Sequence, residues 1–245
     1  MNFCIIYGTR PEFLKLKVLI DTFKNNNIDI SVIKINQHAS FTDDIGYFNE
    51  IINIENYSDN RLSNIGSTIL NNLPKYINDS THILTQGDTS TAYYGLLVGF
   101  QMRKICIHLE AGMRTYDLDN PYPEEGYRQM ISRITDIHLC PSDNEKNNLI
   151  NEKVKGKIYV IGNTILDLVS SYNIQIKFEN NVLITLHRRE NWNDYSVYIN
   201  NLCLLASKHT NITFIFLAHY NPSLQAILKN IETIPSNFKI LQPLP

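Results

Sequence analysis

Residues 3 to 12, FCIIYGTRPE, join a short apolar run to the start of a helix, and this junction decides the predicted fold. The apolar run is rich in residues that favour β-strands and ends at a glycine. Thr9 and Glu12 then fit a capping box, in which Thr9 caps the helix and Glu12 reaches back to the cap. Pro11 is tolerated in the first helical turn. The stretch therefore predicts a strand, a tight turn and a helix over 11 to 25.

The same strand-then-helix order continues along the chain. In the helix predicted over 11 to 25, Phe13, Leu16, Ile20 and Phe23 recur at helical spacing and form one apolar stripe. The β-rich runs are FCIIY, ISVIKI, HILTQ, ICIHL, DIHLC and KIYVIG, and further helix-length segments lie at 89 to 102, 143 to 152 and 164 to 172. This alternation predicts βαβ units and an α/β fold with a doubly wound, mostly parallel sheet.

Polar, Asn-rich residues from 173 to 181 separate this series from a second one. The second series contains the β-rich runs VLITL, ITFIFLA and FKIL, with helices expected at about 196 to 208 and from Pro222 to about 230. We expect a Rossmann-like N-terminal domain over 1–172 and a Rossmann-like C-terminal domain over 173–245. Three strands and two helices make a thin domain, so the second is expected to be incomplete.

Composition excludes several classes of function. The 22 basic and 24 acidic side chains give a net charge of −2, so no basic stripe predicts a nucleic-acid partner. The start of the chain does not resemble a signal peptide, and no apolar stretch approaches the roughly 20 residues that span a bilayer. We expect a cytoplasmic protein without a membrane partner. The cysteines lack metal-binding spacing and are interpreted as core thiols: Cys4, Cys106, Cys140 and Cys203.

Polar side chains follow the predicted strands at their carboxyl ends, where open α/β sheets bind ligands. After FCIIY come Gly8, Arg10 and Lys15. A small glycine, the unpaired N–H groups of a helix N-terminus and two cations outline a diphosphate site. The alternative is that Gly8 only makes a tight turn and that Arg10 is a surface cation.

Two acids follow the next central strands. Asp88 comes after HILTQ, and at a strand-to-helix turn its commonest role is that of a helix N-cap, which we favour when Asp88 is taken alone. Glu110 comes directly after ICIHL. A carboxylate that leaves a buried strand loses solvation unless it is paired, so a structural pair with Arg114 is the alternative to a ligand role.

Two further groups follow the same rule. Glu124 lies behind two prolines, and an i,i+4 surface ion pair with Arg128 would explain it without a function. His187 follows VLITL and is next to arginines, which is a poor choice for a core, so we favour ligand contact. The shared position at strand ends makes the joint interpretation stronger than any single signal.

Taken together, eight segments resemble the UDP-N-acetylglucosamine 2-epimerase family in order and spacing. They are GTRPEFLK (8 to 15), NQH (36 to 38), QGDTSTAYYG (86 to 95), HLEAGMRT (108 to 115), PYPEEGYRQ (121 to 129), IGNTILD (161 to 167), LHRREN (186 to 191) and AHYNP (218 to 222). The resemblance implies a GT-B-like architecture of two Rossmann-like domains facing across a cleft, and a cytoplasmic homodimer. It also implies interconversion of UDP-GlcNAc and UDP-ManNAc without a cofactor, in polysaccharide biosynthesis.

The family's chemistry gives roles to the matching residues. Its members eliminate UDP to form 2-acetamidoglucal and then add UDP back, so two proton-handling positions are needed on opposite faces of the sugar. The resemblance implies that Asp88, Glu110 and Glu124 are the acid/base carboxylates and that His187 assists at the diphosphate or the sugar. The residues that it places at the UDP-sugar are Arg10, Lys15, Gln37, His38, Arg114, Arg128, Arg188 and His219. Gln37, Glu124, Arg188 and His219 also match a second, activating sugar-nucleotide pocket of many bacterial members. No metal is implied.

Three alternatives stay open beside this isomerase hypothesis. The hydrolysing branch of the family releases free ManNAc and UDP, but it usually varies the GTRPE and HxEAG motifs, which are intact here. A GT-B glycosyltransferase rests on fold analogy alone. Family members also continue beyond the last matching motif, into segments that hold the uridine and the phosphates. The third alternative is therefore an inactive remnant, or a partner subunit that keeps the N-terminal half of the site.

Overall fold

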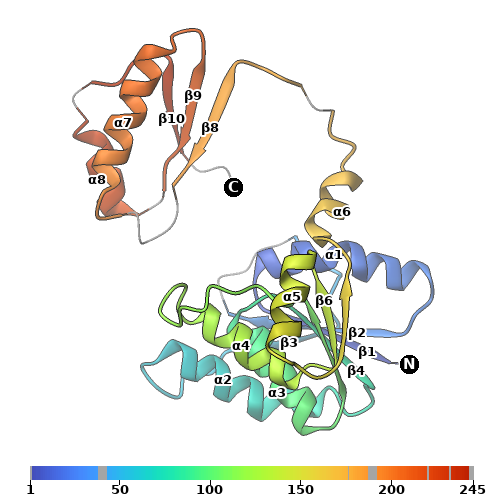
Figure 1. The fold of residues 1–245 in the computed structure, drawn as a ribbon. Helices are drawn as coiled ribbons and strands as arrows, with labels where there is room; N and C mark the ends of the chain where they lie inside the picture. The colour runs from blue at the N-terminus through green and yellow to red at the C-terminus, as the bar shows by residue number, and fades with distance from the viewer. Residues whose placement is uncertain are drawn as a thin grey trace. The chain divides into compact units, whose positions relative to one another are not determined.

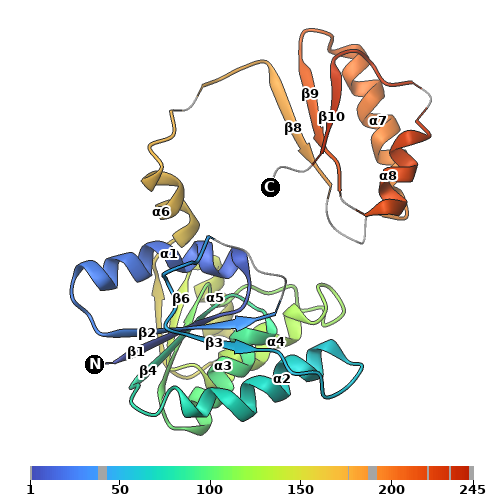
Figure 2. The same ribbon diagram turned by 180° about the vertical axis from the view of Figure 1, so that it is seen from behind.

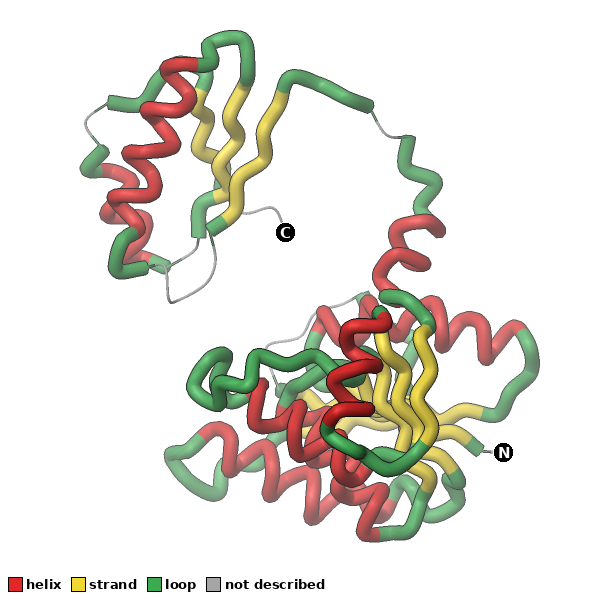
Figure 3. The backbone as a smooth tube through the Cα atoms, in the orientation of Figure 1, coloured by secondary structure: helices red, strands yellow, loops and turns green. Residues whose placement is uncertain are grey.

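The structure is a computed structural model that describes residues 2–37, 43–175, 177–186, 192–219, 221–231 and 233–242. The chain divides into two compact units, Met1–Ile174 and Gln175–Pro245. In both units, the strands of a sheet alternate with helices along the chain (Figure 3).

The first unit is built on a parallel sheet of seven strands in the order β3-β2-β1-β4-β5-β6-β7. The strands are β1 (Phe3–Tyr7), β2 (Ile30–Asn36), β3 (Glu50–Asn53), β4 (His82–Gln86), β5 (Ile105–Leu109), β6 (Ile137–Cys140) and β7 (Lys157–Val160). The strand order reverses between β1 and β4. The predicted doubly wound parallel sheet is therefore confirmed, and β1, β4 and β5 lie at its centre.

Helices cover both faces of this sheet (Figures 1 and 2). They are α1 (Arg10–Asn25), α2 (Arg61–Asn72), the 3₁₀ helix η1 (Leu73–Lys75), α3 (Ser90–Gln101), α4 (Glu124–Ile134), α5 (Asp143–Asn151) and α6 (Thr164–Ser171). Helices α2, α3 and α4 pack in succession on one face, whereas α1 packs with α6 on the other.

The alternation of side chains along β1 divides the core into two layers. Cys4 and Ile6 are fully buried in the cluster under α2, α3 and α4. Ile5 and Tyr7 are fully buried in the cluster under α1. A strand buried on both faces explains the unbroken apolar run that opens the sequence.

The start of α1 has the predicted cap. The Thr9 side chain accepts from the Glu12 backbone N–H, and the Glu12 carboxylate accepts from the Thr9 backbone N–H, so the capping box is confirmed. In the predicted stripe, Phe13, Leu16 and Ile20 are fully buried, and Phe23 is partly buried. The helix thus begins immediately after the turn that follows β1.

Strand β3 and helix α2 were not predicted from the sequence. Strand β3 is an edge strand of four residues with one buried side chain, Ile52, so it has almost no alternation to recognise. Helix α2 was overlooked although Leu62, Ile65 and Ile69 recur at helical spacing. Its first residue, Arg61, lines a hollow together with Asp88 and Glu124.

The second unit has a parallel sheet of three strands in the order β10-β9-β8. Its elements are β8 (Asn181–Thr185), α7 (Tyr195–Lys208), β9 (Thr213–Leu217), α8 (Pro222–Lys229) and β10 (Phe238–Leu241). Helices α7 and α8 cover one face of this sheet (Figure 1), and Tyr195, Phe216 and Phe238 belong to the core between them.

Two further observations concern the whole chain. All four cysteines are buried and free, as the interpretation of core thiols requires. Among the residues that the structure describes, no helix has both the length and the apolar character needed to cross a membrane.

Candidate functional site

The candidate site lies where the three central strands of the first unit end. The turn after β1 carries Gly8 and Thr9, the turn after β4 carries Asp88, and Glu110 follows β5 directly. Because β1, β4 and β5 are parallel neighbours, these turns meet at one edge of the sheet.

Glu110 is held by a lysine and an amide. Lys15 Nζ lies 2.8 Å from Glu110 Oε1 and 2.6 Å from Oε2, and Gln86 Nε2 also donates to Oε2. The Glu110 side chain is 14% exposed, so the ion pair is open to a ligand on one side. The backbone φ of 68° turns the residue out of the strand direction in a conformation that is rare outside glycine.

The predicted alternative for Glu110, a structural pair with Arg114, is wrong. Arg114 forms a bidentate pair with Glu152, at 2.7 Å from Nε to Oε1 and 3.0 Å from Nη2 to Oε2, and it also donates to Ser132. Its side chain is 1% exposed. The structure therefore places Arg114 in the scaffold that supports the loop after β5, and the ligand role expected for it stays a prediction.

Asp88 is held by an arginine from α4. Arg128 donates from Nε at 2.7 Å and from Nη2 at 2.6 Å to Asp88 Oδ2. The N-cap interpretation of Asp88 is wrong, because the cap of α3 is Thr89, whose hydroxyl accepts from Ala92 N at 3.2 Å. The Asp88 carboxylate is thus not used to start the helix.

The ion pair expected between Glu124 and Arg128 is also wrong. Within the described chain, Arg128 pairs with Asp88 and, at 3.3 Å, with Glu125. Glu124 is the first residue of α4 and lines a hollow of about 200 Å³ with Asp88, Gln37 and Arg61. The structure therefore brings three predicted site residues, Gln37, Asp88 and Glu124, to one hollow.

Glu110 lines a different hollow. It borders a narrow recess with Lys15, next to Asn163 and Thr164 at the start of α6. The described lining residues of this recess are all different from those around Asp88 and Glu124. The site thus presents carboxylates at two separate positions.

The turn before α1 is held by the capping carboxylate. The backbone N–H groups of Gly8 and Thr9 donate to Glu12 Oε2 at 3.0 and 2.7 Å. Gly8 is small for another reason, because a Cβ there would overlap Gln37 Nε2 and Thr91 Oγ1, which are hydrogen bonded to each other.

Among the expected diphosphate ligands, Arg10 is the more accessible cation, because Lys15 is paired with Glu110. Arg10 pairs with Asp43 at 2.5 Å, but both side chains are largely open to solvent. A pair this exposed contributes about 0–1 kcal/mol, so an incoming anion could replace Asp43 at small cost.

Glu12 is a functional candidate that the sequence analysis treated only as a cap residue. Its side chain is 2% exposed and also accepts from Thr89 Oγ1 at 2.6 Å. Burial raises the pKa of Glu12, and the hydrogen bonds from Thr89, Thr9 and Gly8 oppose that effect. One carboxylate thereby joins the turn after β1 to the turn after β4.

Glu125 was also missed, although it stands beside Glu124. It is fully buried and accepts from Thr115 N, Tyr116 N and Gln129 Nε2 at 2.9 to 3.1 Å. Burial alone would raise its pKa, but the hydrogen bonds together lower the pKa of Glu125 below its ordinary value. Glu125 thus supplies a fixed negative charge next to Arg128.

Three of the remaining predicted site residues, His38, His187 and Arg188, lie outside the described residues. His219 lies in the second unit, where its Nδ1 accepts from Asn221 N at 3.0 Å and its ring contacts Trp192.

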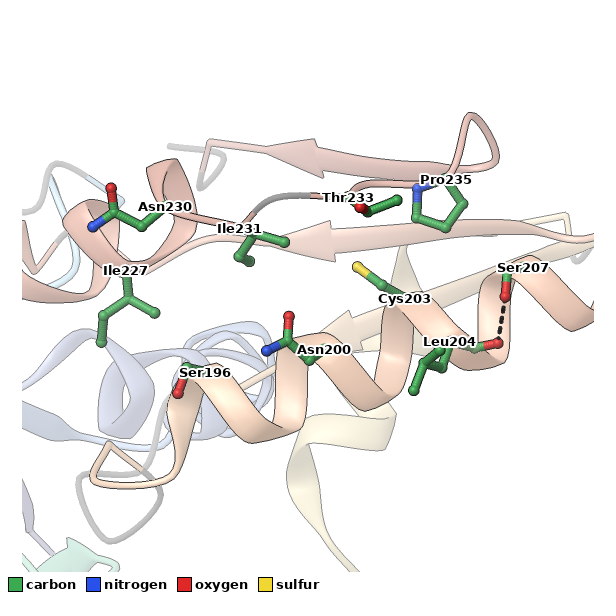
Figure 4. A pocket seen from close by; sticks show the side chains of 10 residues that line it. All are labelled: Ser196, Asn200, Cys203, Leu204, Ser207, Ile227, Asn230, Ile231, Thr233 and Pro235. Atoms are coloured by element: carbon green, nitrogen blue, oxygen red, sulfur yellow. Dashed lines mark hydrogen bonds between the residues drawn. The ribbon is translucent and has the colours of Figure 1, made fainter.

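The second unit holds a larger hollow, of about 650 Å³, between α7 and the segment that follows α8 (Figure 4). Ser196, Asn200 and Cys203 of α7 face Ile227 and Ile231 across it. Among the residues that the structure describes, its lining contains no charged side chain and no histidine, and none of the predicted site residues lines it.

Comparison with known proteins adds an independent finding. A family model described as UDP-N-acetylglucosamine 2-epimerase matches residues 21–245. The UDP-N-acetylglucosamine 2-epimerase of Salmonella borreze is 32% identical over 98% of this chain and 70% of its own length. That of Campylobacter jejuni is 31% identical with the same coverage of both chains.

Solved structures give the same result. A putative UDP-N-acetylglucosamine 2-epimerase from Listeria monocytogenes matches with a TM-score of 0.87 and 25% identity, over 100% of this chain and 69% of the other. UDP-GlcNAc 2-epimerase from Neisseria meningitidis, solved with UDP-GlcNAc bound, matches with a TM-score of 0.85 and 28% identity, over 100% and 73%. These matches confirm the predicted resemblance and the predicted α/β, GT-B-like fold class.

Proposed function

The chain belongs to the UDP-N-acetylglucosamine 2-epimerase family, and from this membership we propose that its first unit supplies the acid/base groups for epimerisation of UDP-GlcNAc. The proposed reaction interconverts UDP-GlcNAc and UDP-ManNAc. The observation that carries the proposal is that carboxylates line two separate hollows at this edge of the sheet, with Asp88 and Glu124 in one and Glu110 in the other.

Inversion at sugar carbon 2 by elimination and addition needs two such positions. In the first step a carboxylate removes the proton from carbon 2, a double bond forms between carbons 1 and 2, and the bond from carbon 1 to UDP breaks with its electron pair. In the second step UDP adds back to carbon 1 after a proton is delivered to carbon 2 from the opposite face. General acid–base help of this kind contributes about 10²- to 10⁴-fold per group.

The partners of each acid support these roles. Arg128 fixes Asp88 from α4 with two N–H groups on one oxygen, so the second oxygen, Oδ1, is not taken by this pair. Lys15 contacts both oxygens of Glu110 and carries a positive charge into the recess. A cation beside the site favours the negative charge that develops on the departing diphosphate. Arg10, the first residue of the same helix α1, is the second cation, and its exposed pair with Asp43 leaves it free to reorient.

The relatives support UDP-GlcNAc as the substrate. The Neisseria meningitidis enzyme is described as bound to UDP-GlcNAc, and that of Methanocaldococcus jannaschii as a complex with UDP-GlcNAc and UDP. A nucleotide sugar presents a diphosphate and an acetamido sugar, which match the cations and the carboxylates of the site.

Product analysis tests the proposal against its alternatives. Purified protein is incubated with UDP-GlcNAc, and the products are separated by anion-exchange chromatography. Appearance of UDP-ManNAc at constant total UDP-sugar supports epimerisation. Release of free ManNAc and UDP would assign the chain to the hydrolysing branch instead. A folded chain that binds UDP but forms neither product would support a partner subunit that keeps only part of the site.

A further inference from the structure

Two histidines lie side by side in the sheet and provide a natural comparison. His108 of β5 and His138 of β6 are register partners, so their side chains project from the same face. They are 2% and 0% exposed. His108 Nε2 lies 2.7 Å from the Gly87 carbonyl oxygen, and His138 Nε2 lies 2.9 Å from the Lys155 carbonyl oxygen.

These contacts define the tautomer of both rings. A carbonyl oxygen can only accept, so Nε2 carries the hydrogen in each case. The Nδ1 atoms are buried and have no partner among the described residues. Burial is the largest effect on both rings and lowers the pKa of His108 to about 4, and it lowers the pKa of His138 as well. Both histidines are therefore neutral donors at neutral pH.

The two histidines differ in what they hold. Lys155 lies in the connection between α5 and β7, far along the chain from the acids. The carbonyl of Gly87 belongs to the peptide bond that leads into Asp88. Gly87 has a φ of 77°, which glycine adopts readily because it has no side chain. With no side chain to restrict the turn, its direction depends on its hydrogen bonds.

Strand β5 holds this turn with consecutive residues. The Gly87 N–H donates to the Leu109 carbonyl at 3.0 Å, the Gly87 carbonyl accepts from His108, and Gln86 donates to Glu110. Both ends of the Gly87 residue are thus fixed to the strand that delivers Glu110. Loss of the His108 bond would leave the peptide before Asp88 held on one side only.

We propose that His108 is a positioning residue that fixes the Gly87–Asp88 peptide, and through it the place of Asp88 relative to Glu110. His108 does not touch the sugar in this role and exchanges no proton with it. The inference rests on the proposed function, because it is the acid/base role of Asp88 and Glu110 that makes their relative placement matter for the reaction.

The test compares His108→Phe, His108→Gln and the matched variant His138→Phe. Phenylalanine keeps the ring volume and removes the donor, whereas the glutamine amide can restore a donor near the position of Nε2. The first readout is amide hydrogen exchange over residues 86 to 91, which needs no turnover. The second is kcat and KM for UDP-GlcNAc epimerisation.

We expect His108→Phe to speed amide exchange over 86 to 91 by about tenfold, and to lower kcat by about tenfold with KM nearly unchanged. His108→Gln should recover most of both effects. His138→Phe should lower thermal stability to a similar degree and leave both readouts as in the unaltered protein.

Two results would overturn the proposal. One is unchanged exchange over 86 to 91 in His108→Phe, and the other is equal acceleration in His138→Phe, which would reduce His108 to a general contributor to stability. If the unaltered chain does not epimerise UDP-GlcNAc, the proposed function fails on that result alone. The exchange comparison still decides whether His108 fixes the turn.

Discussion

At the residue scale, the arrangement of the site depends on which carboxylate each lysine or arginine forms an ion pair with. Lys15 is paired with Glu110, and Arg128 with Asp88, across separations of 95 and 40 residues. Arg114, which is only four residues from Glu110 in the sequence, pairs with Glu152 instead. The sequence could therefore identify the acids as candidates but not the cations that pair with them, because those pairs are determined by the strand order and the helix packing.

Asp88→Asn and Glu124→Gln test the two acids that share a hollow. Each change keeps the shape of the side chain and removes its ability to exchange a proton, so we expect kcat/KM for epimerisation to fall by at least about 10²-fold. Arg128 keeps its contact with Glu125 in Asp88→Asn, so the fold should survive. The measurement is the rate of UDP-ManNAc formation, with folding checked by circular dichroism.

The matched control for these variants is Asp79→Asn. Asp79 is exposed and lies just before β4, at the end of the strand opposite to the site. Its activity should equal that of the unaltered protein. Activity within twofold of the unaltered protein in both Asp88→Asn and Glu124→Gln would contradict their acid/base role.

The lowered pKa of the buried His108 predicts how the stability of the protein depends on pH. Burial lowers the pKa of His108 from its ordinary 6.5 to about 4, against smaller opposing effects of the Gly87 hydrogen bond and Asp88. The unfolded chain takes up the proton first. Stability is therefore complete above about pH 6.5 and is lost as the pH falls towards 4, by roughly 3 kcal/mol for His108.

Urea unfolding of the unaltered protein and of His108→Gln, measured between about pH 7 and pH 4, isolates this contribution. As the pH falls, the free energy of unfolding of the unaltered protein should decrease more than that of the glutamine variant. Parallel curves for the two proteins would show that His108 is protonated equally in the folded and unfolded states.

At the scale of elements, much of the fold could be predicted from local patterns. The capping box of Thr9 and Glu12 and the stripe of Phe13, Leu16 and Ile20 located α1 to within a residue. Apolar runs located β1, β4 and β5 because strands buried on both faces leave a continuous signal. Strand β3 was missed because it buries only Ile52, whereas helix α2 was missed although Leu62, Ile65 and Ile69 recur at helical spacing.

The loop after β5 illustrates what local patterns cannot reveal. Its conformation depends on Arg114, which connects it to Glu152 just after α5 and to Ser132 of α4. Glu125 holds the next residues of the same loop through Thr115 N and Tyr116 N. These long-range polar contacts give the loop its fixed course towards Glu124 and the start of α4.

Arg114→Met tests this scaffold. Removal of the guanidinium leaves the largely buried Glu152 without its main partner, so we expect the free energy of unfolding to fall by about 3–5 kcal/mol. The measurement is urea denaturation at neutral pH.

Arg133→Met is the matched comparison, since Arg133 contacts the same Glu152 but is more than half exposed. This variant should lose less than about 1 kcal/mol. Equal losses in the two variants would show that the Arg114–Glu152 pair is not the element that holds the loop.

At the scale of the whole molecule, the two units have separate cores. The first unit contains the two core clusters on either face of the seven-stranded sheet. The second unit has its own core cluster around Tyr195, Phe216 and Phe238. The carboxylates of the proposed mechanism all come from the first unit. The chain as a whole corresponds to about 70% of the length of its Salmonella borreze and Campylobacter jejuni relatives.

We predict that residues 1–174 fold without the second unit. Their core is closed on both faces by helices of the same unit, as a domain that folds by itself requires. Circular dichroism and a ¹H–¹⁵N correlation spectrum of this fragment should show cooperative unfolding and dispersed amide signals. A molten spectrum with exposed apolar surface would show that the second unit is needed for folding.

The central claim is that the carboxylates of Asp88, Glu124 and Glu110, which line two separate hollows, move the proton of sugar carbon 2. The most direct measurement is proton NMR of the purified protein with UDP-GlcNAc in heavy water. The account predicts UDP-ManNAc that carries deuterium at carbon 2, with deuterium also entering the remaining UDP-GlcNAc because the steps are reversible. UDP-ManNAc that keeps its original hydrogen at carbon 2 would contradict the account, since no carboxylate would then have exchanged that proton with solvent.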